Sequence, residues 1–108
     1  MQVAELARSA LLTVVDFRCD ATPASPTVVE VHGCHSVSFV RRGSFGCRTQ
    51  GKAHELVAGS VLIGHPGDEF LCTHDHHDGG DECLSFQLSE GLVASLDASV
   101  DVWRAGAL

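Results

Sequence analysis

The chain has 108 residues, of which 44% are hydrophobic, and this indicates one globular domain rather than a disordered chain. Its formal net charge of −7 excludes a basic nucleic-acid-binding surface, and no apolar run is long enough for a transmembrane helix. No secretory signal is visible at the N-terminus, so we expect a cytoplasmic protein whose five cysteines are free thiols.

The N-terminal part divides into a helix, a strand and a loop. Apolar residues recur at helical spacing over residues 3–12, which predicts a short helix. The β-branched run at residues 13–15 then favours an extended chain as far as Cys19. Two prolines among small polar residues predict a loop over residues 20–27. We therefore assign residues 1–27 to an N-terminal segment outside the core.

From residue 28 onward the sequence is rich in short alternating segments, with turn residues about every 8–12 positions. This pattern predicts an all-β barrel or sandwich over residues 28–88. Ser89 is a suitable N-cap, so residues 89–108 are expected to form a C-terminal helical segment. The predicted strands are residues 28–31, 36–41, 44–49, 53–57, 60–63, 69–74 and 82–88.

Two motifs between His32 and Phe70 carry a family resemblance. The first is HGCHSVSFVRRG, in which a histidine begins an alternating strand that ends at a glycine, and the second is the proline-glycine turn of AGSVLIGHPGDEF. The segment resembles the N-terminal effector-binding domain of AraC-type transcription regulators. This resemblance implies a cupin-like double-stranded β-helix (jelly roll) with short terminal helices. It also implies a domain that binds a small-molecule or metal-ion effector.

Two departures from the family pattern bear on function. The helix-turn-helix DNA reader of an AraC-type regulator follows the barrel, and the sequence after residue 88 contains none. We therefore expect an isolated domain, truncated before the DNA reader, that is not an enzyme and does not itself bind nucleic acid. Metal-binding cupins use three histidines and a glutamate, and the matching positions here hold Glu30, His32, Ser36 and Phe70. With one histidine of the three, the usual iron or manganese site is not expected.

Strand alternation gathers one set of side chains on the inner side of the predicted barrel. If His32 points inward, other side chains of its strand share that side, and the same holds for the strand that begins near Phe70. The predicted ligand-binding residues are His32, Cys34, Ser36, Phe70, Cys72 and His74. Because this set contains no arginine, an acidic sugar is not expected as the ligand.

The run CTHDHHDGGDEC, residues 72–83, concentrates thiol and imidazole groups, which favour tetrahedral zinc. The predicted zinc ligands are Cys72, His74, His76 and Cys83. A hairpin turn at residues 78–81 would return Cys83 to the side of Cys72. The alternatives are a disulfide between Cys72 and Cys83, or packed thiols beside solvated histidines.

These observations predict the effector-sensing and dimerisation domain of a transcription regulator, in which a ligand entering the barrel shifts a conformational equilibrium. The outward apolar side chains of Val37 and Phe39 would require cover from a terminal helix or from a second subunit, so a homodimer is expected. Two alternatives remain open. A small metal-dependent cupin enzyme, such as a thiol oxygenase or a sugar isomerase, would require a metal in the Cys/His cluster. A structural dimerisation module would have a barrel packed solid.

Overall fold

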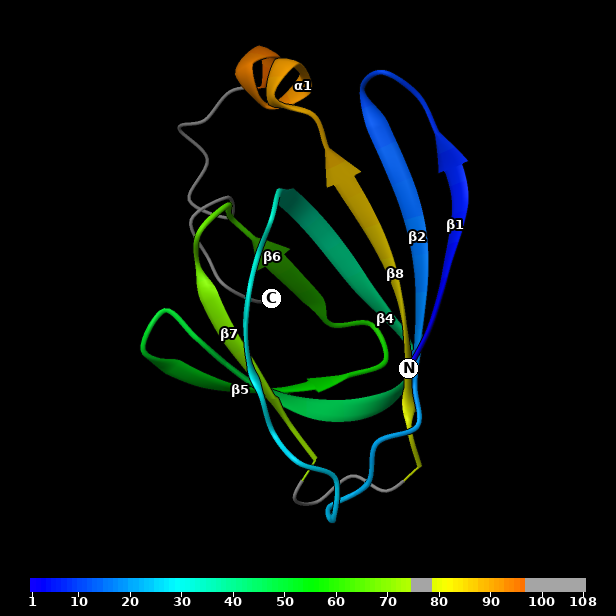
Figure 1. The fold of residues 1–108 in the computed structure, drawn as a ribbon, viewed down its shortest axis with the longest axis vertical. Helices are drawn as coiled ribbons and strands as arrows, with labels where there is room; N and C mark the ends of the chain where they lie inside the picture. The colour runs from blue at the N-terminus through cyan, green and yellow to red at the C-terminus, as the bar shows by residue number, and fades with distance from the viewer. Residues whose placement is uncertain (75–78, 97–108) are drawn as a thin grey trace.

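The computed structural model describes residues 1–74 and 79–96, which form eight β-strands and one short helix (Figure 1). Every strand pair among them is antiparallel, which confirms the predicted all-β class. No helix in these two stretches is long and apolar enough to cross a membrane. The elements are β1 (Gln2–Arg8), β2 (Leu12–Cys19), β3 (Val29–Val31), β4 (His35–Thr49), β5 (Lys52–Val57), β6 (Val61–Gly64), β7 (Glu69–Thr73), β8 (Asp81–Leu88) and α1 (Glu90–Ser95).

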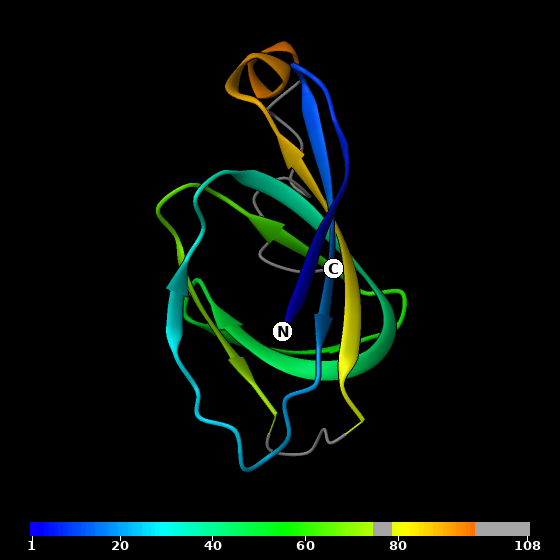
Figure 2. The same cartoon turned by 45° about the vertical axis from the view of Figure 1, so that its right-hand side comes forward.

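The long strand β4 belongs to two sheets. Its first part, up to Gly43, pairs with β8 and β6, and β2 and β1 extend this first sheet beyond β8. Its second part, from Ser44, pairs with β5 and β7, and β3 extends this second sheet beyond β7. Figure 2 shows how strongly β4 curves between the two sheets. The two strands predicted for residues 36–41 and 44–49 are therefore one continuous strand.

A β-bulge in β4 decides which of its side chains face the interior. Between Val40 and Arg42, β4 advances two residues while β8 advances one. Even-numbered side chains such as Ser38 line the interior before the bulge, and odd-numbered ones such as Phe45 do so after it. Gly43 follows with a φ of 78°, and a Cβ atom there would lie 2.0 Å from the carbonyl oxygen of Gly80. Glycine at residue 43 thus permits a close approach of two backbones rather than ending the strand.

The hydrophobic core lies where the two sheets meet. Its buried members come from β4, β5 and β6, and half-buried side chains of β7 and β8 pack against them. The core residues are Val40, Phe45, Cys47, Leu56 and Leu62. This core leaves part of the interior unfilled.

The predicted helix over residues 3–12 is wrong. These residues form β1, a turn and the beginning of β2 instead. In the turn, the Ser9 hydroxyl accepts hydrogen bonds from the backbone N–H groups of Leu11 and Leu12. All seven residues of β1 are exposed, so the apolar positions at helical spacing mark no buried face. Backbone pairing with β2 outweighs the local helix propensity of this segment.

The predicted start of the C-terminal helix is confirmed. The Ser89 hydroxyl accepts a hydrogen bond from the backbone N–H of Leu92 at 3.1 Å, so Ser89 is the N-cap of α1. The predicted loop over residues 20–27 contains no strand or helix.

Candidate ligand-binding cavity

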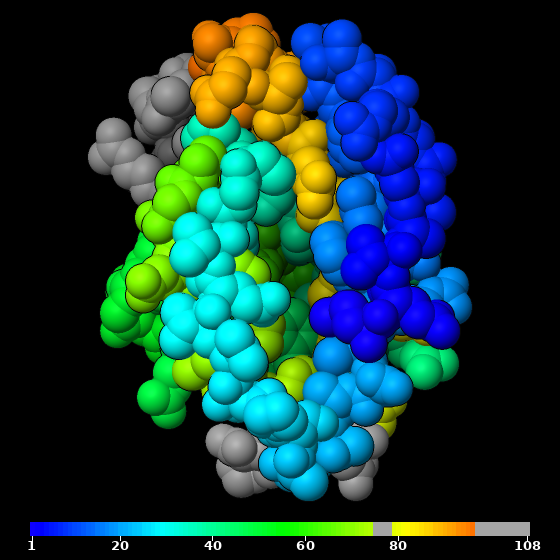
Figure 3. Space-filling model, viewed as in Figure 1, coloured from blue at the N-terminus to red at the C-terminus, as the bar shows by residue number. Residues whose placement is uncertain are grey.

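A cavity of about 470 Å³ lies between the two sheets. In Figure 3 the surface is hollowed between the β3 segment, drawn in cyan, and the N-terminal strands, drawn in blue. A barrel packed solid is therefore not what this chain forms. All six residues predicted to bind a ligand line this cavity, namely His32, Cys34, Ser36, Phe70, Cys72 and His74.

His32 is fixed on the cavity wall from several sides. Its ring stacks on that of Phe70, with 4.1 Å between the centroids and 19° between the planes. Its backbone N–H donates to the Asp68 carbonyl, and its own carbonyl accepts from the Gly67 N–H, both at 2.9 Å. Burial lowers the pKa of the His32 imidazole, which favours the neutral ring at pH 7. The cavity therefore holds an uncharged imidazole in one orientation.

Two buried imidazole nitrogens in this wall have no hydrogen-bond partner within residues 1–74 and 79–96. They are Nε2 of His32 and Nδ1 of His74, the residue that follows β7. Leaving a buried polar group unpaired costs about 1–3 kcal/mol. A molecule in the cavity that offers hydrogen-bonding groups to both histidines would remove that cost.

The remaining polar groups of the cavity come mainly from β4 and β8. The Ser38 hydroxyl donates to the Ser85 hydroxyl at 2.9 Å, which ties the two strands together across the wall. Glu30 and Asp81 are the acidic members of the lining, and no lysine or arginine is among the lining residues that the structure describes. This charge distribution disfavours an anion. Asp81 and Ser85 were missed in the sequence, although they alternate with Cys83 along β8 and so could have been found.

The cavity thiols are held in their protonated form. Cys72 lies opposite Cys47 of β4, and the hydrogen bond between these thiols, together with burial, raises the pKa of Cys72. Burial, with a smaller contribution from Asp81, raises the pKa of Cys83 to about 12. Burial also raises the pKa of Cys34. A metal or an electrophile that reacts with these thiols must first displace a proton.

The residues predicted to bind zinc are only partly brought together. Cys72, His74 and Cys83 line the cavity, whereas His76 falls outside the described residues. The predicted hairpin is wrong, because β4 lies between β7 and β8 in the strand order. Within residues 1–74 and 79–96, no three Cys, His, Asp or Glu side chains gather closely enough to hold a metal.

The four positions to which the family resemblance assigns metal ligands do not fit a metal here. Glu30 lies opposite Phe70 in the β3–β7 register, but its side chain is exposed. The apolar ring of Phe70 covers one face of the His32 imidazole, and Ser36 supplies only a hydroxyl. This set offers one imidazole and one carboxylate, which is fewer strong ligands than a structural or catalytic metal site uses.

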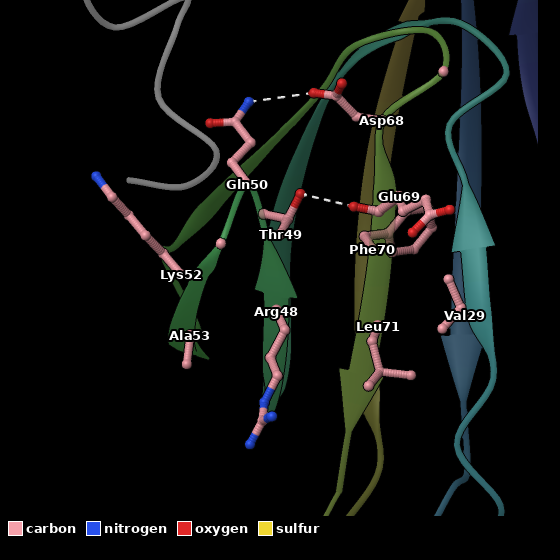
Figure 4. Close-up of a pocket in the computed structure, with 12 residues that line it drawn as sticks. Val29, Arg48, Thr49, Gln50, Lys52, Ala53, Asp68, Glu69, Phe70 and Leu71 are labelled. Atoms are coloured by element: carbon pink, nitrogen blue, oxygen red, sulfur yellow. Dashed lines mark hydrogen bonds between the residues drawn. The ribbon is translucent and has the colours of Figure 1, made fainter.

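A second depression, of about 670 Å³, lies on the outer face of the second sheet (Figure 4). Its rim is joined by hydrogen bonds from the Gln50 amide to the Asp68 carboxylate and from the Thr49 hydroxyl to the Glu69 carbonyl. Exposed Arg48 is among the residues that line it. This mixture of opposite charges in an open groove does not favour one class of ligand, so the inner cavity is the better candidate.

Comparison with known proteins identifies the fold. No family model matches the sequence, and no curated protein matches it. A cupin protein from Bacteroides fragilis is 20% identical over 93% of this chain and 84% of its own, with a TM-score of 0.64. KdgF from Halomonas sp. is 16% identical over 83% and 82%, with a TM-score of 0.63. A cupin superfamily protein from Desulfitobacterium hafniense DCB-2 is 16% identical over 82% and 77%, with a TM-score of 0.63. At these identities the likeness establishes the fold alone, and the fold of this chain is the cupin jelly roll.

Proposed function

We propose that this chain is an effector-binding domain whose cavity takes a small, partly apolar molecule without negative charge. The observation that carries the proposal is that two residues lining one cavity, His32 and His74, each hold a buried ring nitrogen without a partner among the described residues. A neutral ligand with two hydrogen-bonding groups would satisfy both and would replace water along the apolar part of the wall. The phosphate of a sugar phosphate would find no basic side chain among the described lining residues.

The cavity is lined by residues from both sheets, and this supports a sensing role. His32 directly follows β3 of the second sheet, and Ser85 lies on β8 in the first. A ligand that contacts both would favour one spacing of the two sheets over others, which is a population shift. The resemblance of residues 32–70 to AraC-type effector domains supports a regulatory output, in which this shift controls a DNA-binding domain.

Self-association is the second part of the proposed role. Phe39 is 41% exposed on β4, and it points away from the cavity between Ser38 and Val40. A second subunit covering this face would bury its ring. Sedimentation equilibrium of the wild type and of Phe39→Ser tests this part, because we expect a dimer for the wild type and weaker association for the variant. A monomeric wild type would reject the dimer.

Ligand binding is tested with two fluorescent probes of similar shape and different charge. N-phenyl-1-naphthylamine is neutral, and 1-anilinonaphthalene-8-sulfonate carries a negative charge. We expect one neutral probe to bind per chain, and the sulfonate to bind at least tenfold more weakly. In Cys34→Trp, a bulky ring at the cavity wall should lower the affinity for the neutral probe at least tenfold. In Ala53→Trp, the same ring in the outer groove should leave the affinity unchanged.

Two outcomes would reject the proposed cavity site. Equal affinity for the two probes would show that the cavity does not select against negative charge. Loss of probe binding in Ala53→Trp rather than in Cys34→Trp would move the site to the outer groove.

A further inference from the structure

Cys47 and Cys72 face each other across two neighbouring strands. Cys47 lies on β4 and Cys72 on β7, and the antiparallel register places them directly opposite one another. Their interaction lowers the pKa of the Cys47 thiol and raises that of the Cys72 thiol. Residues directly opposite in an antiparallel pair have Cα atoms about 4.5–5.5 Å apart. A disulfide spans Cα distances of about 4.4–6.8 Å, so the Cα spacing typical of such a pair lies within the range that a disulfide bridges.

The other candidate thiol pairs are placed less well. Cys83 lies opposite Phe17, and Cys19 lies opposite Asp81, so Cys19 and Cys83 are diagonal neighbours. Diagonal residues lie about 7–8 Å apart, which exceeds the span of a disulfide. Cys72 and Cys83 lie on strands of different sheets, separated by β4 in the strand order. Register therefore selects Cys47 as the partner of Cys72.

The two thiols differ in access to small molecules. Cys72 lines the cavity, whereas Cys47 is 1% exposed and is not among the cavity residues. A reagent in the cavity would therefore meet the sulfur of Cys72 first. Cys47 lies on the neighbouring strand and belongs to the core, so it is placed to react with a modified Cys72.

We propose that Cys47 and Cys72 form a disulfide when a hydroperoxide enters the cavity, so that this pair is a redox-sensitive site. The Cys72 sulfur, after losing its proton, attacks one oxygen of the peroxide bond, and the other oxygen leaves as an alcohol. Cys72 is then a sulfenic acid. The Cys47 sulfur attacks Cys72, forms the S–S bond and displaces water. In sum, two thiols and one hydroperoxide give one disulfide, one alcohol and one water.

The bond would change the cavity that we propose for the ligand. It would cross-link β4 and β7 and remove the Cys72 thiol from the wall, so oxidation would alter both the polarity and the mobility of the site. Formation of the bond depends on the two thiols and not on a ligand. Its failure would therefore leave the proposed ligand binding intact, and the reverse also holds.

The experiment is exposure of the folded protein to tert-butyl hydroperoxide, followed by thiol blocking and mass analysis without reduction. Hydrogen bonding to Cys47 and burial raise the pKa of Cys72, so mildly alkaline buffer is used to speed the reaction. Cleavage after Arg, Lys and Glu separates the three relevant cysteines, because Cys47 falls in residues 43–48, Cys72 in 70–82 and Cys83 in 83–90. We expect a mass loss of two hydrogen atoms and a linked pair of the first two peptides.

Two variants make the result decisive. Cys83→Ser is the matched control, because Cys83 also lines the cavity and packs against the same core, and it should form the bond as the wild type does. Cys47→Ser should form no bond and should leave Cys72 as a sulfenic acid that dimedone labels. A link between peptides 70–82 and 83–90 in the wild type, or no linked peptides at all, would overturn the proposal. Because the peptide map is read on the wild type, the test survives a variant that fails to fold.

Discussion

Gly64 supports the cavity wall, and replacing it with alanine tests the packing around His32. A Cβ atom at residue 64 would lie 2.5 Å from the Ser36 hydroxyl oxygen and 2.6 Å from Nδ1 of His32. Ordinary contact begins near 3.4 Å, so the imidazole would have to retreat by about 0.8 Å. Its stacking on Phe70 opposes that movement. Overpacking of this kind costs about 1–3 kcal/mol, and we expect Gly64→Ala to lower the free energy of unfolding by that amount.

Gly33 provides the matched control. It also lines the cavity, but a Cβ atom there would meet no atom within 4 Å, and its φ is not positive. Gly33→Ala should therefore be neutral, or stabilising by about 0.4–1 kcal/mol through the unfolded chain. Urea unfolding followed by far-ultraviolet circular dichroism gives both free energies. Binding of N-phenyl-1-naphthylamine should weaken only in Gly64→Ala. A Gly64→Ala protein as stable as the wild type would refute the packing described for His32.

Three further predictions use the same kind of comparison. Gly51→Ala should lower the free energy of unfolding by about 1–2 kcal/mol, because the φ of Gly51 is 73° although no atom lies near its would-be Cβ. Gly43→Ala adds a collision with backbone atoms and should lower the free energy of unfolding by at least about 1 kcal/mol more, as measured by thermal melts. Burial lowers the pKa of His32, so the unfolded chain takes up the proton more readily, and stability present above pH 6.5 should fall as the pH drops below it. Urea unfolding of His32→Gln should show a smaller fall, and an unchanged slope would contradict the burial of His32. The pKa of Cys83 is about 12 in the folded protein, against an ordinary value of 9.0, so its thiolate is roughly a thousandfold less abundant at pH 8 than in the unfolded chain. A thiolate of higher pKa is more nucleophilic, and over this difference its reactivity is about 25-fold greater, which offsets part of the loss. Iodoacetamide should alkylate it about 40 times more slowly than in the unfolded chain, and equal rates would contradict its burial.

Local patterns predicted the strands and the residues that line the cavity. His32, Cys34 and Ser36 were predicted to share one interior space, and all three line the cavity, although residues 32–34 lie between β3 and β4 rather than in a strand. The prediction that a strand ends at Gly43 was wrong. A glycine in the sequence can mark either a turn or, as here, a positive φ within a continuous strand. The helix expected over residues 3–12 failed because β2 supplies backbone partners that no local pattern reveals.

The relation between strands could not be predicted from the sequence. The expected hairpin brought Cys83 beside Cys72, since the two strands follow one another along the chain. In the structure β4 lies between them, and the residue opposite Cys72 is Cys47. A contact between residues 47 and 72 depends on the register of two strands that are separated by β5 and β6 in the chain. Such a register follows from the packing of the whole domain.

The central position of β8 delays the completion of the first sheet. This strand lies between β2 and β4 and pairs with both along its length. During synthesis β2 and β4 emerge first, so each keeps one edge unpaired until residues 81–88 follow. The sheet must then close by insertion of its last strand, and pairing so distant along the chain is intrinsically slow. A nascent chain stalled before residue 81 would present two open edges onto which a strand of another chain can add.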